Sequence, residues 1–150
     1  MMDDHKLEIL DKMAPEIEER ILDYASHPEG GLFDLLEDIV YMDDLEAFEA
    51  VFENGGNINL QNKYGWTPLH IAIRRDRRDM VAYLLAHGAD INKQDGVGWT
   101  PLMESIMDDM PELCKTLLDA GADTSIANER GGTAAMLVQK FGRTSMMGMF

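Results

Sequence analysis

The stretch Gly65-Trp66-Thr67-Pro68-Leu69-His70-Ile71-Ala72 occurs again, in shortened form, as Gly98-Trp99-Thr100-Pro101-Leu102. Every matched position is offset by 33 residues. A fixed period of that length indicates one supersecondary unit stacked on copies of itself. We therefore expect a solenoid, in which each unit packs only against its neighbours.

The residues of this stretch predict the start of a short helix. Thr67 has a suitable N-cap side chain, and Pro68 suits the first helical position because its φ is already set. Gly88 is predicted to end a second helix in the left-handed conformation. The apolar stripe of that second helix has i, i+1, i+4, i+5 spacing and consists of Met80, Val81, Leu84 and Leu85.

Thr-Pro-Leu-His-x-Ala at a 33-residue period resembles the ankyrin repeat. The resemblance covers residues 29–142 and is strongest at 62–127. It implies an all-α fold, an ankyrin-repeat solenoid of stacked helix-turn-helix units with hairpin-like turns and a concave face. It also implies that proteins bind at the turn tips and at the exposed side of each first helix.

We divide the chain into one domain of 150 residues with five segments. These are an N-terminal helical cap at 1–28, a degenerate first repeat at 29–61, the second and third repeats at 62–94 and 95–127, and a truncated C-terminal repeat at 128–150. The alternative for residues 1–28 is a partner-binding arm. The apolar tail at 146–150 is expected to fray.

Several aspartates are expected to cap helices, because a carboxylate accepts backbone N–H groups as threonine does. Asp34 stands at the Thr67 position of the first repeat. The pairs Asp43-Asp44 and Asp108-Asp109 lie near the turn before a second helix.

The net charge of −15 disfavours binding to nucleic acid or to an anionic membrane, and it suits a basic protein partner. The alternative is that acidity only keeps the chain soluble. Residues 1–61 carry a net charge of −14 and residues 62–94 carry +3. The arginines at 74, 75, 77 and 78 are therefore alternative partners for the acidic side chains of the first repeat.

The chemistry of an enzyme is missing from the sequence, and we predict no catalytic, cofactor-binding or metal site. Cys114 occupies the Val81 position on an apolar stripe, so it is expected to be a buried small hydrophobe. His70 belongs to the repeat motif, for which the resemblance implies a structural role. A single cysteine fits a reducing compartment, and the chain has neither a signal-peptide pattern nor a membrane-length apolar run, so we expect a cytoplasmic protein.

Carrying the family's contact positions onto this sequence gives a set of predicted protein-binding residues. They are Phe33, Tyr41, Met42, Tyr64, Trp66, Arg74, Arg75, Trp99, Met107, Asp108 and Arg130. Aromatic residues are common among binding hot spots. Two interpretations of the tryptophans stay open, namely contact with a partner and packing on the neighbouring turn.

Two functions follow from these features. A small, acidic, free-standing chain of this kind resembles bacterial immunity-type ankyrin proteins, which implies an antitoxin or inhibitor that blocks a basic toxin or enzyme. The alternative is a regulatory adaptor or scaffold subunit that self-associates through its apolar tail.

Overall fold

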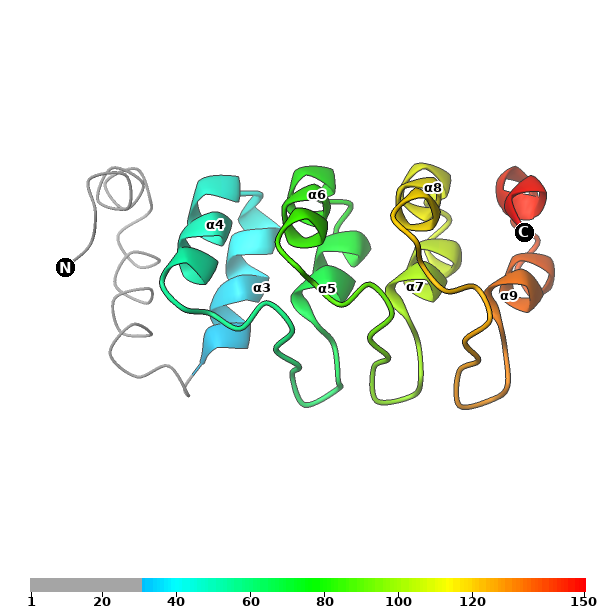
Figure 1. Cartoon of the computed structure of the whole chain (residues 1–150), viewed down its shortest axis with the longest axis horizontal. Coiled ribbons are helices and arrows are strands. Elements are labelled where there is room, and N and C mark those ends of the chain that lie inside the picture. The colour runs from blue at the N-terminus through cyan, green and yellow to red at the C-terminus, as the bar shows by residue number, and fades with distance from the viewer. Residues whose placement is uncertain (1–30) are drawn as a thin grey trace.

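The computed structural model describes residues 31–150, and the predicted cap at 1–28 lies outside them. The described helices form successive pairs, and Figure 1 shows these pairs side by side in one row with long loops on one edge. The pairs are α3 (Leu32–Met42) with α4 (Leu45–Glu53), α5 (Pro68–Arg74) with α6 (Arg78–Ala86), α7 (Pro101–Met107) with α8 (Pro111–Asp119), and α9 (Ala134–Lys140) with the 3-10 helix η1 (Thr144–Met149). This part of the chain has no strand, which confirms the all-α prediction.

The helix starts predicted from the Thr-Pro motif are confirmed in the second and third repeats. The Thr67 side chain accepts the backbone N–H of His70, and Pro68 occupies the first turn of α5. Thr100 and Pro101 do the same for α7. Both helices end after seven residues, so each exposes only a short first-helix surface.

The first repeat begins differently because it lacks the Thr-Pro pair. Without a Thr-Pro pair to set the first helical residue, α3 starts at Leu32, after Gly31 at a φ of 74°, and extends over eleven residues. The capping role predicted for Asp34 is therefore wrong, since Asp34 lies within the first turn of α3. Its negative charge still complements the helix N-terminus. Phe33 consequently lies on a helix and not in a turn.

The aspartate pairs before the second helices have different outcomes. Asp44 caps α4, and its side chain accepts the Ala47 N–H at 3.1 Å. The capping predicted for Asp108 and Asp109 is wrong, because Met110 takes the N-cap position of α8 and has no capping side-chain bond. Asp109 instead turns the chain in the left-handed conformation, with a φ of 54°.

The core runs along the row of pairs in columns that repeat every 33 residues. The second helices contribute one such column, whose members are fully buried: Val51, Leu84 and Leu117. Phe48, Val81 and Cys114 form another buried column, which confirms the packing role predicted for the cysteine. Each unit therefore buries its apolar face only against its neighbours.

The C-terminal tail is ordered, so the prediction that it frays is wrong. Residues 144–149 form η1, which contacts α8 and α9. Met146 is fully buried. Arg143 holds the start of η1, because its Nε donates to the Ile106 carbonyl at 2.9 Å.

The long loops are hairpin-like and bonded to one another. In the second repeat, the Asn62 side-chain oxygen accepts the N–H groups of Tyr64 and Trp66 at 2.9 and 3.0 Å. The Gly96 N–H of the next loop donates to the Tyr64 carbonyl at 2.9 Å. A Cβ on Gly65 would lie 2.4 Å from the Gly96 nitrogen, so only glycine permits this approach. The loop that carries Trp66 therefore has a fixed position beside α5.

Candidate functional site

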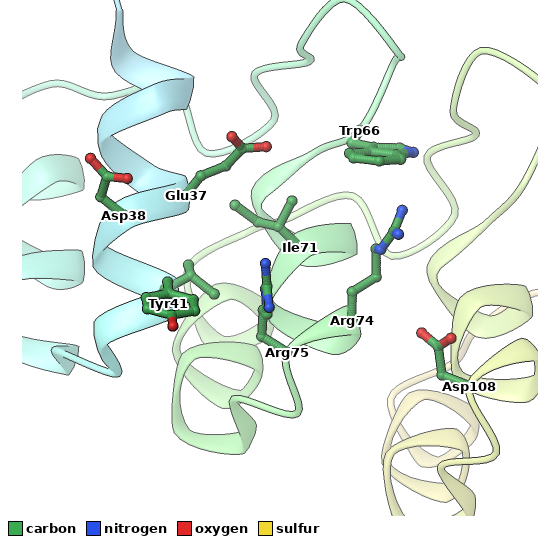
Figure 2. A pocket seen from close by; sticks show the side chains of 9 residues that line it. Glu37, Asp38, Tyr41, Trp66, Ile71, Arg74, Arg75 and Asp108 are labelled. Carbon is green, nitrogen blue, oxygen red and sulfur yellow. The ribbon is translucent and has the colours of Figure 1, made fainter.

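A depression of about 510 Å³ opens across α3, α5 and the end of α7 (Figure 2). We call it the central groove. It is lined by Glu37, Asp38, Val40, Tyr41, Trp66, Ile71, Arg74, Arg75 and Asp108. Five of the predicted protein-binding residues come together here, namely Tyr41, Trp66, Arg74, Arg75 and Asp108.

Arg74 lies over the indole of Trp66. The guanidinium carbon is 4.1 Å from the indole centroid, a distance typical of cation–π contact. The indole also lies 5.2 Å from the Tyr64 ring and packs partly against the core. Trp66 thus has a packing role, while its contact with Arg74 holds that guanidinium at the groove.

Arg75 is placed over a second aromatic ring. Its guanidinium carbon is 5.3 Å from the centroid of Tyr41, whose side chain is 66% exposed. The central groove therefore contains two consecutive arginines, the last residue of α5 and its C-cap, each resting on an aromatic residue.

The other two arginines of this segment serve the scaffold. Arg77 donates from Nε to the Val40 carbonyl and from a terminal nitrogen to the Tyr41 carbonyl, both at 2.8 Å, and it lies 3.7 Å from Asp43. Arg78 pairs with Asp76 and Glu112. Among the described contacts, pairing with an acidic side chain of the first repeat is confirmed for Arg77 alone.

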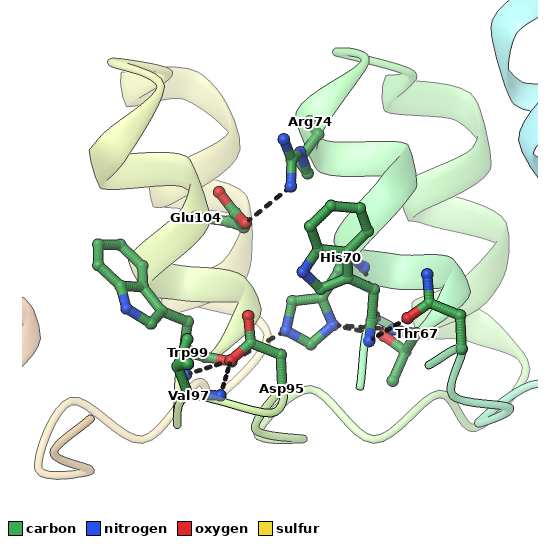
Figure 3. Close-up of polar contacts among 9 residues, drawn as sticks. Thr67, His70, Arg74, Asp95, Val97, Trp99 and Glu104 are labelled. Atoms are coloured by element: carbon green, nitrogen blue, oxygen red, sulfur yellow. Dashed lines mark hydrogen bonds and ion pairs between the residues drawn. The ribbon is translucent and has the colours of Figure 1, made fainter. Parts of the chain in front are cut away.

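Glu104 lies beside the central groove at the position that Ile71 has in the preceding repeat. It is only 8% exposed, and its carboxylate is 3.8 Å from Arg74 (Figure 3). Burial raises the pKa of Glu104 to about 7, with Arg74 acting against the shift and Asp108 adding to it. Burial also raises the pKa of Asp108, against the opposing effect of Arg74. Negative charge is therefore costly on this side of the groove.

His70 joins the second repeat to the third and has the structural role that the motif implied. Its Nδ1 accepts the Thr67 N–H at 3.1 Å, and its Nε2 lies 3.0 Å from the Trp99 carbonyl (Figure 3). These partners require a neutral ring with the proton on Nε2. Burial lowers the pKa of His70, which agrees with that state.

The remaining predicted residues lie outside the central groove. Trp99 and Arg130 line a second depression of about 590 Å³, beside the exposed Val97 and Met136. Phe33 and Tyr64 line a third depression of about 790 Å³ at the start of α3. Met42 and Met107 are exposed but line none of these three.

Three polar residues at the central groove are absent from the predicted set of binding residues: Glu37, Asp38 and Glu104. Glu37 and Asp38 lie one turn before Tyr41, so i, i+3 and i, i+4 spacing would have placed them beside it. Glu104 replaces an apolar residue of the repeat, which was a visible signal that this position differs.

Residues 31–150 contain no cluster of three or more histidine, cysteine, aspartate or glutamate side chains that could hold a metal ion. Burial raises the pKa of the Cys114 thiol, which disfavours the reactive thiolate. Over the same residues, no helix has the length and apolar character needed to cross a membrane.

The paired helices, the 33-residue period and the bonded loops define a helical-repeat solenoid. The family model described as ankyrin repeats (3 copies) matches residues 36–128, and the chain belongs to the ankyrin-repeat family. Such repeats are typically non-catalytic modules that bind other proteins, so protein partners are implied.

A human protein, 2-5A-dependent ribonuclease, is 41% identical to this chain over 54 residues. The shared stretch covers 35% of this chain and 7% of the human protein. The chain therefore spans a small fraction of that relative, and the similarity concerns a repeat region and not the whole enzyme.

Proposed function

We propose that this protein is a non-enzymatic interaction module that holds a protein partner in the central groove. The observation that carries the proposal is the placement of Arg74 and Arg75 on Trp66 and Tyr41, facing one depression. Side chains already ordered on aromatic rings lose little further entropy on binding, which favours affinity. Arginine and aromatic residues are also the side chains most enriched at binding hot spots.

The partner we propose is basic overall, and this protein acts as an immunity protein or antitoxin that covers the active site of a basic toxin or enzyme. The net charge of −15 supports this, because a strong negative field speeds encounter with a basic protein. The same field disfavours nucleic acid and anionic membranes as partners. We place the protein in the cytoplasm, where a single reduced cysteine is stable.

The test is co-expression with the products of neighbouring genes, followed by co-purification and measurement of the Kd. Trp66→Ala and Arg74→Glu are expected to weaken capture at least about tenfold, or about 1.4 kcal/mol. Asp119→Asn, at an exposed site on α8, is the matched control and should leave the Kd unchanged. Inhibition of the captured partner's own activity supports the antitoxin role. Capture that is equally strong with both groove variants would contradict the proposed site.

The second candidate is an adaptor or scaffold subunit that self-associates through its C-terminal end. The observation in its favour is the exposure of Met147 and Phe150, at 47% and 39%. Sedimentation equilibrium over a hundredfold range of concentration tests it. A mass that stays at 16.9 kDa throughout rules out self-association.

A further inference from the structure

We propose that the central groove recognises an extended segment of the partner in which one acidic residue is flanked on both sides by basic residues. This inference rests on the proposed function and specifies the chemistry of the partner. It follows from the order of charges across the groove, from the available hydrogen-bond donors of the two arginines and from the spacing of the helices.

Charge changes sign from helix to helix across the groove. The α3 side presents exposed Glu37 and Asp38, the C-terminal end of α5 presents Arg74 and the C-cap Arg75, and Asp108 follows at the end of α7. Figure 2 shows the two α3 carboxylates on one side of the arginines and Asp108 on the other. A bound segment with complementary charge must therefore be basic, acidic and basic in turn.

The two arginines retain hydrogen-bonding capacity at their edges. The nearest described carboxylate to Arg74 is Glu104 at 3.8 Å, which exceeds hydrogen-bond distance, and the described contacts of Arg75 include no ion pair. A guanidinium resting on an aromatic face keeps its edge N–H groups available to bind a carboxylate in bidentate fashion. Arg77 differs, because its donors are used on the carbonyls of α3. The centre of the groove is thus suited to an acidic side chain.

A cation of the partner would stabilise the charged form of the acidic side chains at the flanks of the groove. Glu104 and Asp108 are one helical turn apart, and burial destabilises the charge on both. A basic side chain of the partner placed beside them would compensate for that burial. Glu37 has no ion pair among the described residues and is exposed, so it offers the same interaction on the opposite flank.

The distances between the three charged zones require an extended peptide segment as the ligand and are too long for one small charged group. Neighbouring packed helices lie about 8–10 Å apart, so the zones span about 16–20 Å. An extended chain advances about 3.3 Å per residue, which gives about three residues per helix. The expected pattern is basic-x-x-acidic-x-x-basic, and it reads the same in both chain directions.

Peptides of identical composition separate charge order from overall charge. The first is acetyl-Lys-Gly-Ser-Glu-Gly-Ser-Lys-amide, and the second moves the glutamate to the first position, giving acetyl-Glu-Gly-Ser-Lys-Gly-Ser-Lys-amide. Both carry the same net charge, so attraction to an acidic protein is equal for the two. Titration of the full chain, followed by NMR chemical shifts, is expected to show at least a tenfold lower Kd for the peptide with the central glutamate.

Charge-swapped protein variants complete the test. Replacing both Arg74 and Arg75 with glutamate is expected to abolish the preference and to favour a third peptide that has lysine at all three charged positions. Arg78→Glu changes the charge on α6, outside the groove, and should keep the wild-type preference. Circular dichroism checks that each variant is folded.

The outcomes distinguish this inference from the proposed function. Equal Kd values for the first two peptides, or no binding of either at millimolar concentration, would overturn the reading of charge order. The proposed function would still stand if Arg74→Glu abolished capture of a natural partner. If the Arg74 and Arg75 double variant keeps both the capture of the partner and the peptide preference, the inference and the proposed function are both overturned.

Discussion

At the scale of single residues, Glu104 departs most clearly from the repeat pattern. The equivalent positions in the neighbouring repeats hold Ile71 and Leu137, each 5% exposed, whereas Glu104 places a carboxyl group in the same environment. Among residues 31–150, Arg74 is its one ion-pair partner, at 3.8 Å. A buried carboxyl with so weak a partner favours its neutral form.

Glu104→Gln is expected to change how stability depends on pH. The pKa of Glu104 is raised from 4.5 to about 7 in the folded state, so between these values the folded protein binds more protons than the unfolded one. The contribution of this group to stability is therefore present below pH 4.5 and is lost as pH rises to about 7. The loss is at most about 3 kcal/mol.

Urea unfolding from pH 4.5 to pH 8 measures this effect. The variant should match the wild type near pH 4.5, where both side chains are neutral, and should become more stable by about 2–3 kcal/mol at pH 8. Asp119→Asn removes one charge from an exposed position and controls for the change in net charge. A stability difference for Glu104→Gln that does not vary with pH would contradict the expected shift.

The residue-scale predictions that were confirmed depend on local chemistry. Thr67, Pro68 and Gly88 act on their own backbone neighbours, and the motif is sufficient to assign their roles. Residues of the central groove were only partly predicted, because Glu37 shares the groove with Arg74, and Glu104 lies 3.8 Å from Arg74, through the stacking of separate repeats. Sequence spacing within one helix does not show such contacts.

At the scale of elements, two arginines join neighbouring helix pairs in the same way. Arg77 donates to the carbonyls of Val40 and Tyr41, and Arg143 donates to those of Ile106 and Met107. The two arginines are 66 residues apart, which equals two repeats. The position between them holds Met110, so the last carbonyls of α5 receive no such arginine.

Met110→Arg is expected to stabilise the junction between the second and third repeats. The new side chain should reach the carbonyls of Ile73 and Arg74, and Asp76 stands where Asp43 accompanies Arg77. Charge-assisted hydrogen bonds of this kind should raise the free energy of unfolding by about 1 kcal/mol after the lost methionine packing is deducted.

Arg77→Met is the reciprocal variant and should lower the free energy of unfolding by about 1–3 kcal/mol. Midpoints and slopes of urea unfolding measure both changes. If Met110→Arg lowers stability, the arginine contact depends on features of the first and last repeats that the middle junction lacks.

At the scale of the whole molecule, one short element closes the C-terminal end of the stack and stabilises it. The 3-10 helix η1 takes the place of a second helix in the fourth unit, and its Met146 is fully buried whereas Met147 is 47% exposed. Because each unit contacts only its neighbours, damage at one end should weaken that end most.

Met146→Ala is expected to cost about 2–5 kcal/mol, whereas Met147→Ala, the control, should change stability by less than about 0.5 kcal/mol. Native-state hydrogen exchange should show the largest loss of protection in α8 and α9 and smaller losses in α3 and α4. A uniform loss across all helices would show that the described units unfold as one body.

The sequence by itself determined the repeat and its local elements. The 33-residue period, the Thr-Pro starts and the apolar stripes act through neighbouring backbone groups, and they were sufficient to predict the all-α stack. Only the tertiary structure decided which side chains meet at the groove and that the apolar tail is ordered. Those features depend on contacts between repeats, where Arg74 meets Glu104 and η1 packs on α8. Such contacts follow from how the units stack in space, which a linear pattern of residues does not specify.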